Sequence, residues 1–399
     1  MVFRHRNFAL FFFGLIISNS GTWMAQTARS WLVHEITGSG AALGLVFGAF
    51  GIPMVLFPYF GGVIGDRFDR RKVLWVTQII AALNALVLGF LIATDVLEIW
   101  HIVVVSFAQG TVLAFDQPPR QALLPDLVPR DELRSAIAMN SSVFTGAAFI
   151  GPAIFGLLVG QWGVPLAAIF FINAASFGSV MIALSIMRLP KHDSPGMSSD
   201  VHESMGEGLR FAIGSELVMT VMVLTVVSSM FGSSYQTLLP IFADVIFNSG
   251  EQGLGVMTSA GGAGAIVGSA LLGFGARLPR NGILIPISSL VFAALMVGFA
   301  ASPDFILSIA LLFALGFTST LVMAGCRTVM QLETPRHLMG RVMSLYAIAV
   351  IGFGPMGGFI AGPLADLTGA QNAIYIASAV VGVTTVFILK IKPVLRSAD

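Results

Sequence analysis

The sequence is poor in charged residues and has almost no cysteine. Only 10% of its 399 residues are charged, whereas soluble globular proteins carry about 25%, so the chain has too few charges to cover a water-exposed surface. The formal net charge of +1 gives no reason to expect nucleic acid as a partner. The single cysteine, Cys326, excludes a disulfide framework and a cysteine-rich metal site. We find no nucleotide-binding loop, metal-ligand cluster or nucleophile constellation in the sequence, and we therefore expect no enzyme activity, no cofactor and no metal.

Hydrophobic residues, by contrast, make up 56% of the chain, which also has 44 Gly and 32 Phe. Glycine lets membrane helices approach closely, and a helix needs about 20 mainly apolar residues to cross a bilayer. Twelve runs of this kind predict an all-α membrane protein with twelve transmembrane helices. The runs are Phe8–Val33, Ala41–Phe60, Val73–Thr94, Ile99–Phe115, Ser135–Gln161, Val164–Met187, Leu217–Phe242, Gly253–Phe274, Ile283–Ala301, Phe305–Cys326, Val342–Ala365 and Ala373–Ile391.

The basic residues orient these predicted helices. When the N-terminus is placed in the cytoplasm, every one of the 21 Lys and Arg residues except Arg29 falls in a cytoplasmic segment. Cytoplasmic loops carry this excess of positive charge, and a missed or additional span would scramble the pattern. We therefore predict that both termini are cytoplasmic.

The chain also divides into two similar halves. The polar segment Leu189–Ser215 separates the predicted helices into two groups of six. Three basic positions after the fourth helix recur at nearly equal separations after the tenth: Arg120, Arg130 and Arg134 match Arg327, Arg336 and Arg341. A repeat of half the chain is typical of transporters built from parallel repeats. We predict an N-terminal six-helix bundle over residues 1–188, a central cytoplasmic loop over 189–215 and a C-terminal six-helix bundle over 216–399.

A charged loop lies between the second and third predicted helices. It reads Gly61-Gly62-Val63-Ile64-Gly65-Asp66-Arg67-Phe68-Asp69-Arg70-Arg71-Lys72. Charges at a membrane edge are costly unless they pair, so Asp66 could bind a helix N-terminus or an arginine of a neighbouring helix. Such a contact is a latch that forms when one side of the membrane is closed and breaks when it opens. The alternative is an ordinary positive-inside loop with a tight turn.

This loop resembles the signature loop of the major facilitator superfamily, G-x-x-x-D-R-x-G-R-R. The matching residues are Gly62, Asp66, Arg67, Arg70 and Arg71, while Asp69 stands where the family usually has glycine. The resemblance implies the major facilitator fold in two six-helix bundles. It also implies a latch of six residues, in which the charges of Asp66, Arg67 and Arg71 act against the start of the eleventh span. The latch residues are Gly62, Asp66, Arg67, Arg70, Arg71 and, at that start, Arg341.

The fifth and eleventh predicted helices resemble the glycine-proline motif of exporters in this superfamily. The motif residues are Gly151, Pro152 and Gly156 in the fifth helix, and Gly354 and Pro355 in the eleventh. The match is imperfect because Phe155 replaces a glycine, and ordinary glycine-rich helix packing is the alternative. The loop over residues 115–129 is similar to that of a bacterial exporter subgroup, the transmembrane secretion effectors, which includes siderophore exporters and macrolide or multidrug efflux pumps.

In this family the first, fourth, seventh and tenth spans line a central cavity. The predicted cavity residues are Asn19, Thr22, Trp23, Gln26, Arg29, Ser106, Gln109, Tyr235, Gln236 and Thr318. The polar residues of the first span recur on one helical face. A mostly apolar cavity with a few polar anchors suits an amphipathic organic molecule. For any single Ser or Thr, a hydrogen bond to its own helix is the alternative.

Two charged residues fall within the predicted cavity-lining spans. Arg29 is a candidate for substrate binding or for an outer gate, and snorkelling to the outer interface is the alternative. Asp116 lies near the inner end of the fourth span, too far from Arg29 to pair with it. If Asp116 is buried, it could load a proton, which makes it the candidate for proton coupling. The alternative is a solvated carboxylate at a helix end.

The resemblance implies a secondary active transporter in the bacterial plasma (inner) membrane. We expect it to export amphipathic small molecules, such as a drug or a siderophore, by alternating access and proton antiport. The expected partners are the lipid bilayer, a small-molecule cargo and protons, with no nucleic acid, and the expected oligomeric state is a monomer. One alternative is a facilitator or importer of a small organic solute. An alternative of another class is a non-transporting membrane sensor or scaffold on the same fold.

Overall fold

The computed structural model describes residues 2–57, 60–61, 64, 68–187, 201–273 and 281–391. Within these ranges the chain is helical and contains no strand, which confirms the all-α prediction. Eleven helical segments in this described part are long and apolar enough to cross a membrane. They are Arg6–Thr37, Arg70–Ala93, Ile99–Asp126, Ser135–Gln161, Leu166–Ile186, Glu216–Ile246, Gly250–Gly273, Gly282–Ala301, Phe305–Glu333, Met339–Thr368 and Ala370–Lys390.

The second predicted span, Ala41–Phe60, corresponds to a shorter apolar helix, α2 (Gly40–Leu56). Its 17 residues rise about 25 Å, somewhat less than the hydrocarbon core of about 30 Å. Helical hydrogen bonding continues beyond its last residue, because the backbone N–H of Phe57 donates to Pro53 O at 2.8 Å and that of Gly61 to Phe57 O at 3.0 Å. The described chain therefore has eleven helical segments long enough to cross a membrane and one shorter apolar helix.

The chain forms two compact units, and neither is a continuous stretch of sequence. The first unit comprises Met1–Gly38, Ile52–Met197 and Ala243–Ser259. The second comprises Ser39–Gly51, Ser198–Phe242 and Ala260–Asp399. The beginning of α2 therefore packs with helices from the second half of the sequence, and the beginning of α11 (Gly250–Gly273) packs with helices from the first half.

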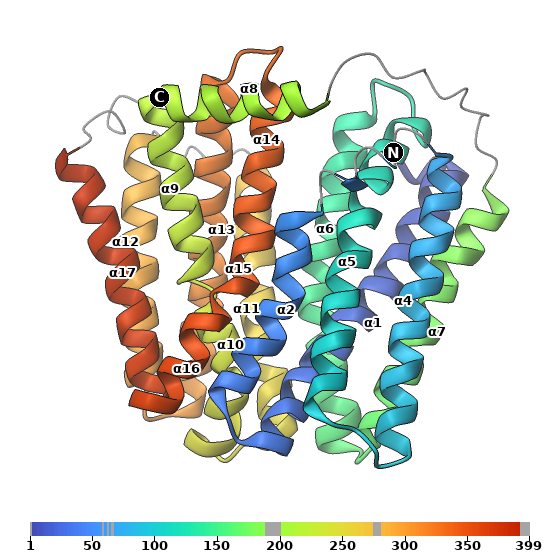
Figure 1. Cartoon of the computed structure of the whole chain (residues 1–399), viewed down its shortest axis with the longest axis vertical. Helices are drawn as coiled ribbons and strands as arrows, with labels where there is room; N and C mark the ends of the chain where they lie inside the picture. The colour runs from blue at the N-terminus through green and yellow to red at the C-terminus, as the bar shows by residue number, and fades with distance from the viewer. Residues whose placement is uncertain are drawn as a thin grey trace. The chain divides into compact units, whose positions relative to one another are not determined.

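Five long helices build most of the first unit (Figure 1). They are α1 (Arg6–Thr37), α4 (Arg70–Ala93), α5 (Ile99–Leu123), α6 (Leu133–Phe155) and α7 (Leu166–Ile186), with the short turns η1 (Val2–Arg4), η2 (Leu124–Asp126) and the π-helix η3 (Gly156–Gln161). α1 packs against α6 and α7, and α4 packs against α5 and α7. Their core includes Phe8 and Leu15 from the start of α1 together with Leu123 from the end of α5, so these two helices run in opposite directions.

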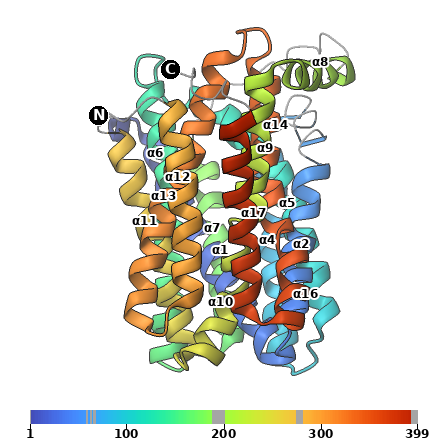
Figure 2. The same cartoon turned by 90° about the vertical axis from the view of Figure 1, so that its left-hand side faces the viewer.

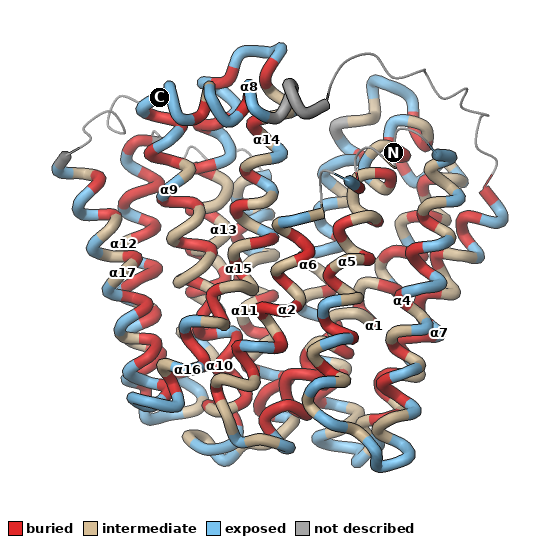
Figure 3. The backbone as a smooth tube through the Cα atoms, in the orientation of Figure 1, coloured by how far each residue is buried: buried red, intermediate tan, exposed pale blue. Residues whose placement is uncertain are grey.

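Helix α4 exposes apolar side chains and buries polar ones. Its exposed apolar residues recur along one face and include Val76, Leu83 and Phe90, while Thr77 and Gln78 are buried on the other side. Exposed and buried surfaces alternate in the same way along the helices of Figure 3. An apolar outer face is stable against lipid, and a polar inner face is stable only when its groups find partners inside the protein.

The second unit contains the helices that follow residue 200. They are α8 (Val201–Gly214), α9 (Glu216–Met230), α10 (Ser234–Ile241), α12 (Asn281–Ala301), α13 (Phe305–Glu333), α14 (Met339–Ala347), the π-helix η5 (Ile348–Gly352), α15 (Phe353–Met356), α16 (Gly358–Thr368) and α17 (Ala370–Ile391); the π-helix η4 (Phe242–Ile246) and α11 extend across the boundary between units. α12 packs against both α13 and α17 (Figure 2). Cys326 is fully buried in the core of this unit.

Part of the predicted central loop is helical. Residues 201–214 form α8, which lies across the ends of α9 and α14 (Figure 1). α8 is held to α14 by an ion pair between Glu207 and Arg341. Gly208 lies beside this pair, where an added Cβ would lie 2.8 Å from the Cβ of Arg341.

Candidate functional site

Arg29 is buried in α1 and faces α5. Its side chain is 9% exposed, and Nη1–H donates to Ser106 Oγ at 2.9 Å. Ser106 is itself fully buried, and Nε of Arg29 has no hydrogen-bond partner. No carboxylate of the described residues forms an ion pair with Arg29. The structure thus joins two of the predicted cavity residues and buries the guanidinium within the first unit.

The other predicted residues of α1 make mostly local contacts. Asn19 Nδ2 donates to Leu15 O at 2.8 Å and Thr22 Oγ1 to Ser18 O at 2.9 Å, as expected for polar groups that satisfy themselves within one helix. The Trp23 ring meets the edge of Phe144 at 5.5 Å between centroids.

Two predicted glutamines flank the contact between Arg29 and Ser106. Gln26 lies three residues before Arg29 on α1, and Gln109 lies three residues after Ser106 on α5. Both side chains are half-buried, and neither amide makes a hydrogen bond to another described residue. These two amides are therefore free to bind a ligand.

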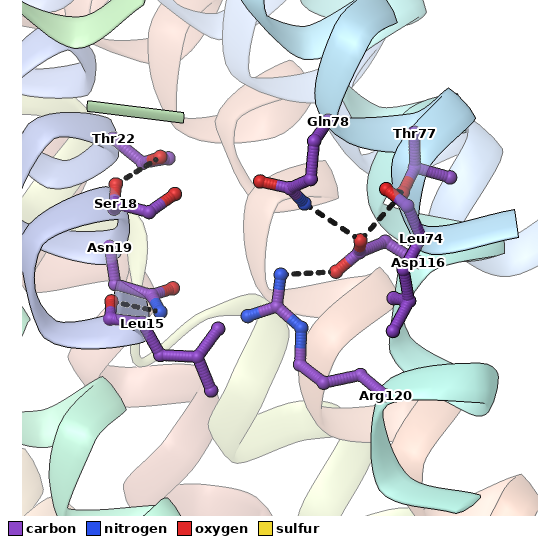
Figure 4. Close-up of polar contacts among 9 residues, drawn as sticks. All are labelled: Leu15, Ser18, Asn19, Thr22, Leu74, Thr77, Gln78, Asp116 and Arg120. Atoms are coloured by element: carbon purple, nitrogen blue, oxygen red, sulfur yellow. Dashed lines mark hydrogen bonds and ion pairs between the residues drawn. The ribbon is translucent and has the colours of Figure 1, made fainter. Parts of the chain in front are cut away.

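Asp116 is the centre of a buried polar network between α4 and α5 (Figure 4). Its Oδ1 accepts hydrogen bonds from Thr77 Oγ1 at 2.7 Å and Gln78 Nε2 at 2.9 Å. Its Oδ2 pairs with the guanidinium of Arg120, one turn further along α5. Asp116 is only 2% exposed, so it is not the solvated helix-end carboxylate that the sequence left open.

The Asp116 network can rearrange. The Thr77 hydroxyl has one hydrogen and two acceptors within reach, Asp116 and the backbone oxygen of Leu74 at 2.9 Å. Gln78 Oε1 and Arg120 Nε are buried without a partner. In Figure 4 the Arg120 guanidinium points from α5 toward the side on which the α1 residues are drawn. If Asp116 lost its charge, the Thr77 hydroxyl could donate to Leu74 O instead. Arg120 would then have no counter-ion.

Three predicted cavity residues belong to the second unit. The Tyr235 ring is 4% exposed and packs against Phe299, with 6.3 Å between centroids. Gln236 Nε2 donates to the Tyr235 hydroxyl at 3.3 Å. Thr318 is buried and bonds to Ala314 O of its own helix at 2.7 Å, which is the local arrangement expected of an isolated threonine.

Half of the predicted latch falls outside the described residues. These latch residues are Gly62, Asp66 and Arg67. Arg341, predicted as the partner side of the latch, pairs with Glu207 of α8. The latch itself therefore stays a prediction.

The two remaining arginines of the signature loop fasten the start of α4. Arg70 Nη1 donates to Ala122 O at 2.9 Å and pairs with Asp126 at 3.1 Å, which ties α4 to the end of α5. Arg71 Nη2 donates to Ser185 O at 3.1 Å near the end of α7. Both arginines thus hold helices of the first unit together.

Asp69, which departs from the family motif, caps helix α4. Its Oδ1 accepts the backbone N–H of Arg71 at 2.8 Å, and this side-chain bond satisfies a donor that the first helical turn leaves free. An aspartate therefore serves where the motif has glycine.

The glycines of the fifth-span motif allow close helix contacts. A Cβ on Gly151 of α6 would lie 2.6 Å from both Ser20 O and Trp23 Cβ of α1. A Cβ on Gly156 would lie 3.2 Å from the Cα of Gly255 in α11. Gly151 is thus required where α6 meets the backbone of α1, and Gly156 makes a tight contact with α11.

Both glycine-proline steps adjoin a π-helical turn. Pro152 lies in α6 shortly before η3, and Pro355 lies in α15 directly after η5. Ser233 Oγ donates to Gly354 O at 2.6 Å and so supplies a partner for this irregular stretch. Proline removes a backbone donor, and π-turns mark places where a helix bends.

Sequence analysis missed a contact between α2 and α16. Asp366 accepts three hydrogen bonds from the start of α2: from Gly40 N at 2.6 Å, Ser39 Oγ at 2.7 Å and Ala41 N at 3.0 Å. A negative charge at a helix N-terminus is favourable. The two helices also meet through glycines at spacings of four, which are Gly40 and Gly44 on α2 and Gly358 and Gly362 on α16. This glycine spacing is the signal that could have revealed the contact.

A second contact that was missed joins α1 to η4. Nε2 of the buried His34 lies 3.0 Å from Oδ2 of Asp244. Asp244 is exposed and belongs to the first unit together with His34. No local pattern links the two residues, which are 210 positions apart.

Comparison with known proteins agrees with this architecture. Residues 2–399 match the transmembrane secretion effector family. The multidrug efflux pump Tap of Mycolicibacterium fortuitum is 26% identical over 98% of this chain and 96% of its own length. The staphyloferrin A transporter of Staphylococcus aureus is 24% identical over 92% and 91%, and macrolide efflux protein A of Streptococcus pyogenes is 22% identical over 92% and 93%.

Solved structures share the fold. A bacterial homologue of the human lysosomal transporter Spinster superposes with a TM-score of 0.74 over 99% of this chain and 97% of that chain, at 14% identity. The nucleoside transporter NupG gives a TM-score of 0.70 over 95% and 98%, also at 14% identity. The chain is a multi-pass membrane transporter of small molecules, not an enzyme, and its bacterial relatives are consistent with the inner membrane. It belongs to the transmembrane secretion effector family of the major facilitator superfamily.

Proposed function

We propose that this transporter exports amphipathic small molecules by alternating access and exchanges them for protons. The direction is supported by the names of the relatives, which include multidrug and macrolide efflux proteins. The exchange is supported by one observation above all, the burial of Asp116 within a network of two hydrogen bonds and one ion pair.

Asp116 has two charge states that differ in their contacts. In the ionised state the pair with Arg120 is neutral overall, which lowers the cost of burying both groups. In the protonated state the guanidinium loses its counter-ion, and a buried charge without a partner favours a rearrangement. A proton on Asp116 thus changes the energy of the surrounding helices, which is what coupling to a conformational change requires.

The cargo, in this proposal, contacts the polar stripe of α1 and the facing residues of α5. Arg29 and Ser106 lie there with Gln26 and Gln109, whose amides make no bond to another described residue. Trp23 adds an aromatic surface near the same stripe. A few polar groups among apolar ones bind amphipathic molecules better than sugars.

The proposed topology has twelve crossings with both termini in the cytoplasm and two six-helix bundles, at residues 1–188 and 216–399. α2 is the twelfth crossing, supported by the helical hydrogen bonds that extend to Gly61. Single cysteines in a Cys326→Ala background test it: a cysteine at Ser39 should react with an impermeant maleimide from outside cells, and one at Glu207 only after lysis. Outside reaction at Glu207 would refute the orientation.

We further propose that Asp66, Arg67 and Arg71 with Arg341 form the inner latch, while Asp366 and the start of α2 form an outer one. The outer latch is supported by the three hydrogen bonds of Asp366. A carboxylate that caps a helix of another segment can release it at modest cost, because each such bond is partly exposed to water.

The function is tested by accumulation of ethidium, erythromycin and a ferric siderophore in cells, with and without a proton uncoupler. An exporter lowers the accumulation of at least one probe, and the uncoupler removes the effect. The variant Asp116→Asn should abolish it, whereas Asp304→Asn, the same substitution at the exposed cap of α13, should not. Equilibration of a probe across the membrane that does not respond to the uncoupler would identify a facilitator. A higher accumulation of a probe than in cells without the protein would identify an importer. No flux of any probe would identify a sensor or scaffold.

A further inference from the structure

We infer that Arg29 binds an anionic group of the cargo, so that the transported molecules are amphipathic carboxylates or chemically similar anions. The inference rests on the proposed function, in which the α1 stripe contacts cargo.

The first observation is that Arg29 lacks a counter-charge. Its guanidinium is buried, yet its only hydrogen bond within the described chain goes to the neutral hydroxyl of Ser106. Nε is buried without a partner. A buried cation is costly unless an anion accompanies it, and an intramembrane charge that persists marks a functional site.

The second observation is that no neighbouring carboxylate in the described part of the chain pairs with Arg29. Glu35, six residues further along α1, is exposed, whereas Arg29 is buried. Asp116 lies ten residues from Ser106, about 15 Å along α5, and pairs with Arg120. Asp244 of η4 lies against α1 and is bonded to His34. None of these three carboxylates forms an ion pair with Arg29, so the missing negative charge is supplied by a bound molecule.

The third observation is that free amides lie beside the guanidinium. α1 and α5 run in opposite directions, because the start of α1 packs with the end of α5. Gln26 and Gln109, each three residues from the Arg29–Ser106 contact, therefore lie at about the same depth, roughly 4.5 Å further along both helices. A carboxylate held by the forked guanidinium would find amide donors on both sides.

Binding to matched pairs of acids and esters tests the inference without a known cargo. The full-length protein in lipid nanodiscs is titrated with fusidate, ibuprofen and dodecanoate, and with the methyl ester of each, using tryptophan fluorescence. Protein-free nanodiscs correct for partition into lipid. We expect at least one acid to bind about 10- to 100-fold more tightly than its ester, as one or two charge-assisted hydrogen bonds allow.

Two variants assign the preference to Arg29. Arg29→Gln keeps a donor for Ser106 but removes the charge, so it should bind the acid and its ester equally. Arg29→Lys keeps the charge and should retain most of the preference. A maleimide dye that reacts with the buried Cys326 only on heating, at the same temperature as in the wild type, shows that both variants are folded. Equal binding of acids and esters by the wild type across all three pairs, or a preference that survives in Arg29→Gln, would overturn the inference.

The result is separable from the proposed function. A preference for acids without any uncoupler-sensitive efflux would leave the anion site intact and refute proton-coupled export. Uncoupler-sensitive efflux of ethidium without a preference for acids would support proton-coupled export and refute the anion site.

Discussion

The contact between α2 and α16 gives a prediction that can be worked from the geometry. In Gly40→Ala the new Cβ would lie 2.6 Å from the carbonyl oxygen of Gly362 and 3.0 Å from Oδ1 of Asp366. Cβ atoms do not approach backbone oxygens this closely, and a backbone cannot turn aside as a flexible side chain can. The two helices must therefore separate, which strains the hydrogen bond from Gly40 N to Asp366.

The expected loss of stability can be taken from the effect of adding a methyl group to other well-packed protein cores. One methyl forced into a filled contact destabilises by about 1–3 kcal/mol. For a unit of 150–250 residues, 1 kcal/mol shifts the melting temperature by about 2–4 °C. We therefore expect the apparent melting temperature of Gly40→Ala to fall by about 2–12 °C. The matched control is Gly382→Ala in α17 of the same unit, whose added Cβ makes only an ordinary contact with the Cβ of Ala293 at 3.7 Å and which gains up to about 1 kcal/mol of helix propensity.

The assay uses the single cysteine of the chain. Cys326 is 0% exposed, so a maleimide dye reacts with it only as the second unit unfolds. Heating purified wild type and both variants with the dye gives three apparent melting temperatures. If Gly40→Ala melts at the same temperature as the wild type, or if the melting temperature of Gly382→Ala falls as much as that of Gly40→Ala, the close packing of α2 on α16 is refuted.

Three further substitutions have defined outcomes. Gln78→Leu removes a hydrogen bond to the Asp116 carboxylate worth about 1.5 kcal/mol. Transport driven by a pH difference in proteoliposomes should therefore slow, by at most about tenfold when all of that energy enters the barrier, with normal insertion. An unchanged rate would contradict the role of the network. Arg341→Ala breaks an ion pair with Glu207 that is largely exposed. The melting temperature should therefore change by no more than about 3 °C. A larger fall would show that the contact of α8 with α14 is essential for stability. Asp69→Ala removes a helix cap worth about 1 kcal/mol, whereas Asp69→Gly costs only a few tenths of a kcal/mol. The alanine variant should therefore melt at a lower temperature than the glycine variant. Equal melting temperatures would exclude the cap.

The sequence predicts most of the helices because the bilayer leaves few choices. A run of about 20 apolar residues has to be helical in lipid, since no water is available to satisfy its backbone. The predicted ends of the helices are wrong where a helix continues beyond the apolar run. The fourth span was predicted to end at Phe115, but α5 runs to Leu123 through Pro118 and Pro119, because membrane helices tolerate proline.

The irregular part of the eleventh span could not be predicted from hydropathy. The predicted run Val342–Ala365 is divided into α14, η5, α15 and α16, with a π-turn just before the glycine-proline step. Hydropathy measures only transfer into lipid and carries no information on where a helix bends. Glycine and proline mark the region, but the register of the π-turn depends on contacts such as that of Ser233 with Gly354.

The sequence predicts only part of the candidate site, because spacing along one helix does not show which helices face each other. The polar stripe of α1 follows from helical spacing alone, and the structure joins one of its members, Arg29, to a predicted residue of α5. The partners of Asp116 on α4 could not be predicted, because Thr77 and Gln78 lie 39 and 38 positions away and no local rule sets which helix faces α5. The same holds for Asp366, more than 320 positions from the helix that it caps.

Exchange in proteoliposomes tests the central claim most directly. Wild type, Asp116→Asn and Asp304→Asn are reconstituted, and uptake of a transported probe is followed both against its gradient under an imposed pH difference and as counterflow without one. We predict that Asp116→Asn keeps counterflow but loses uphill transport, while Asp304→Asn keeps both, because the proposed mechanism assigns the proton to the buried carboxylate of α5. Uphill transport by Asp116→Asn at the wild-type rate would contradict the proposed mechanism.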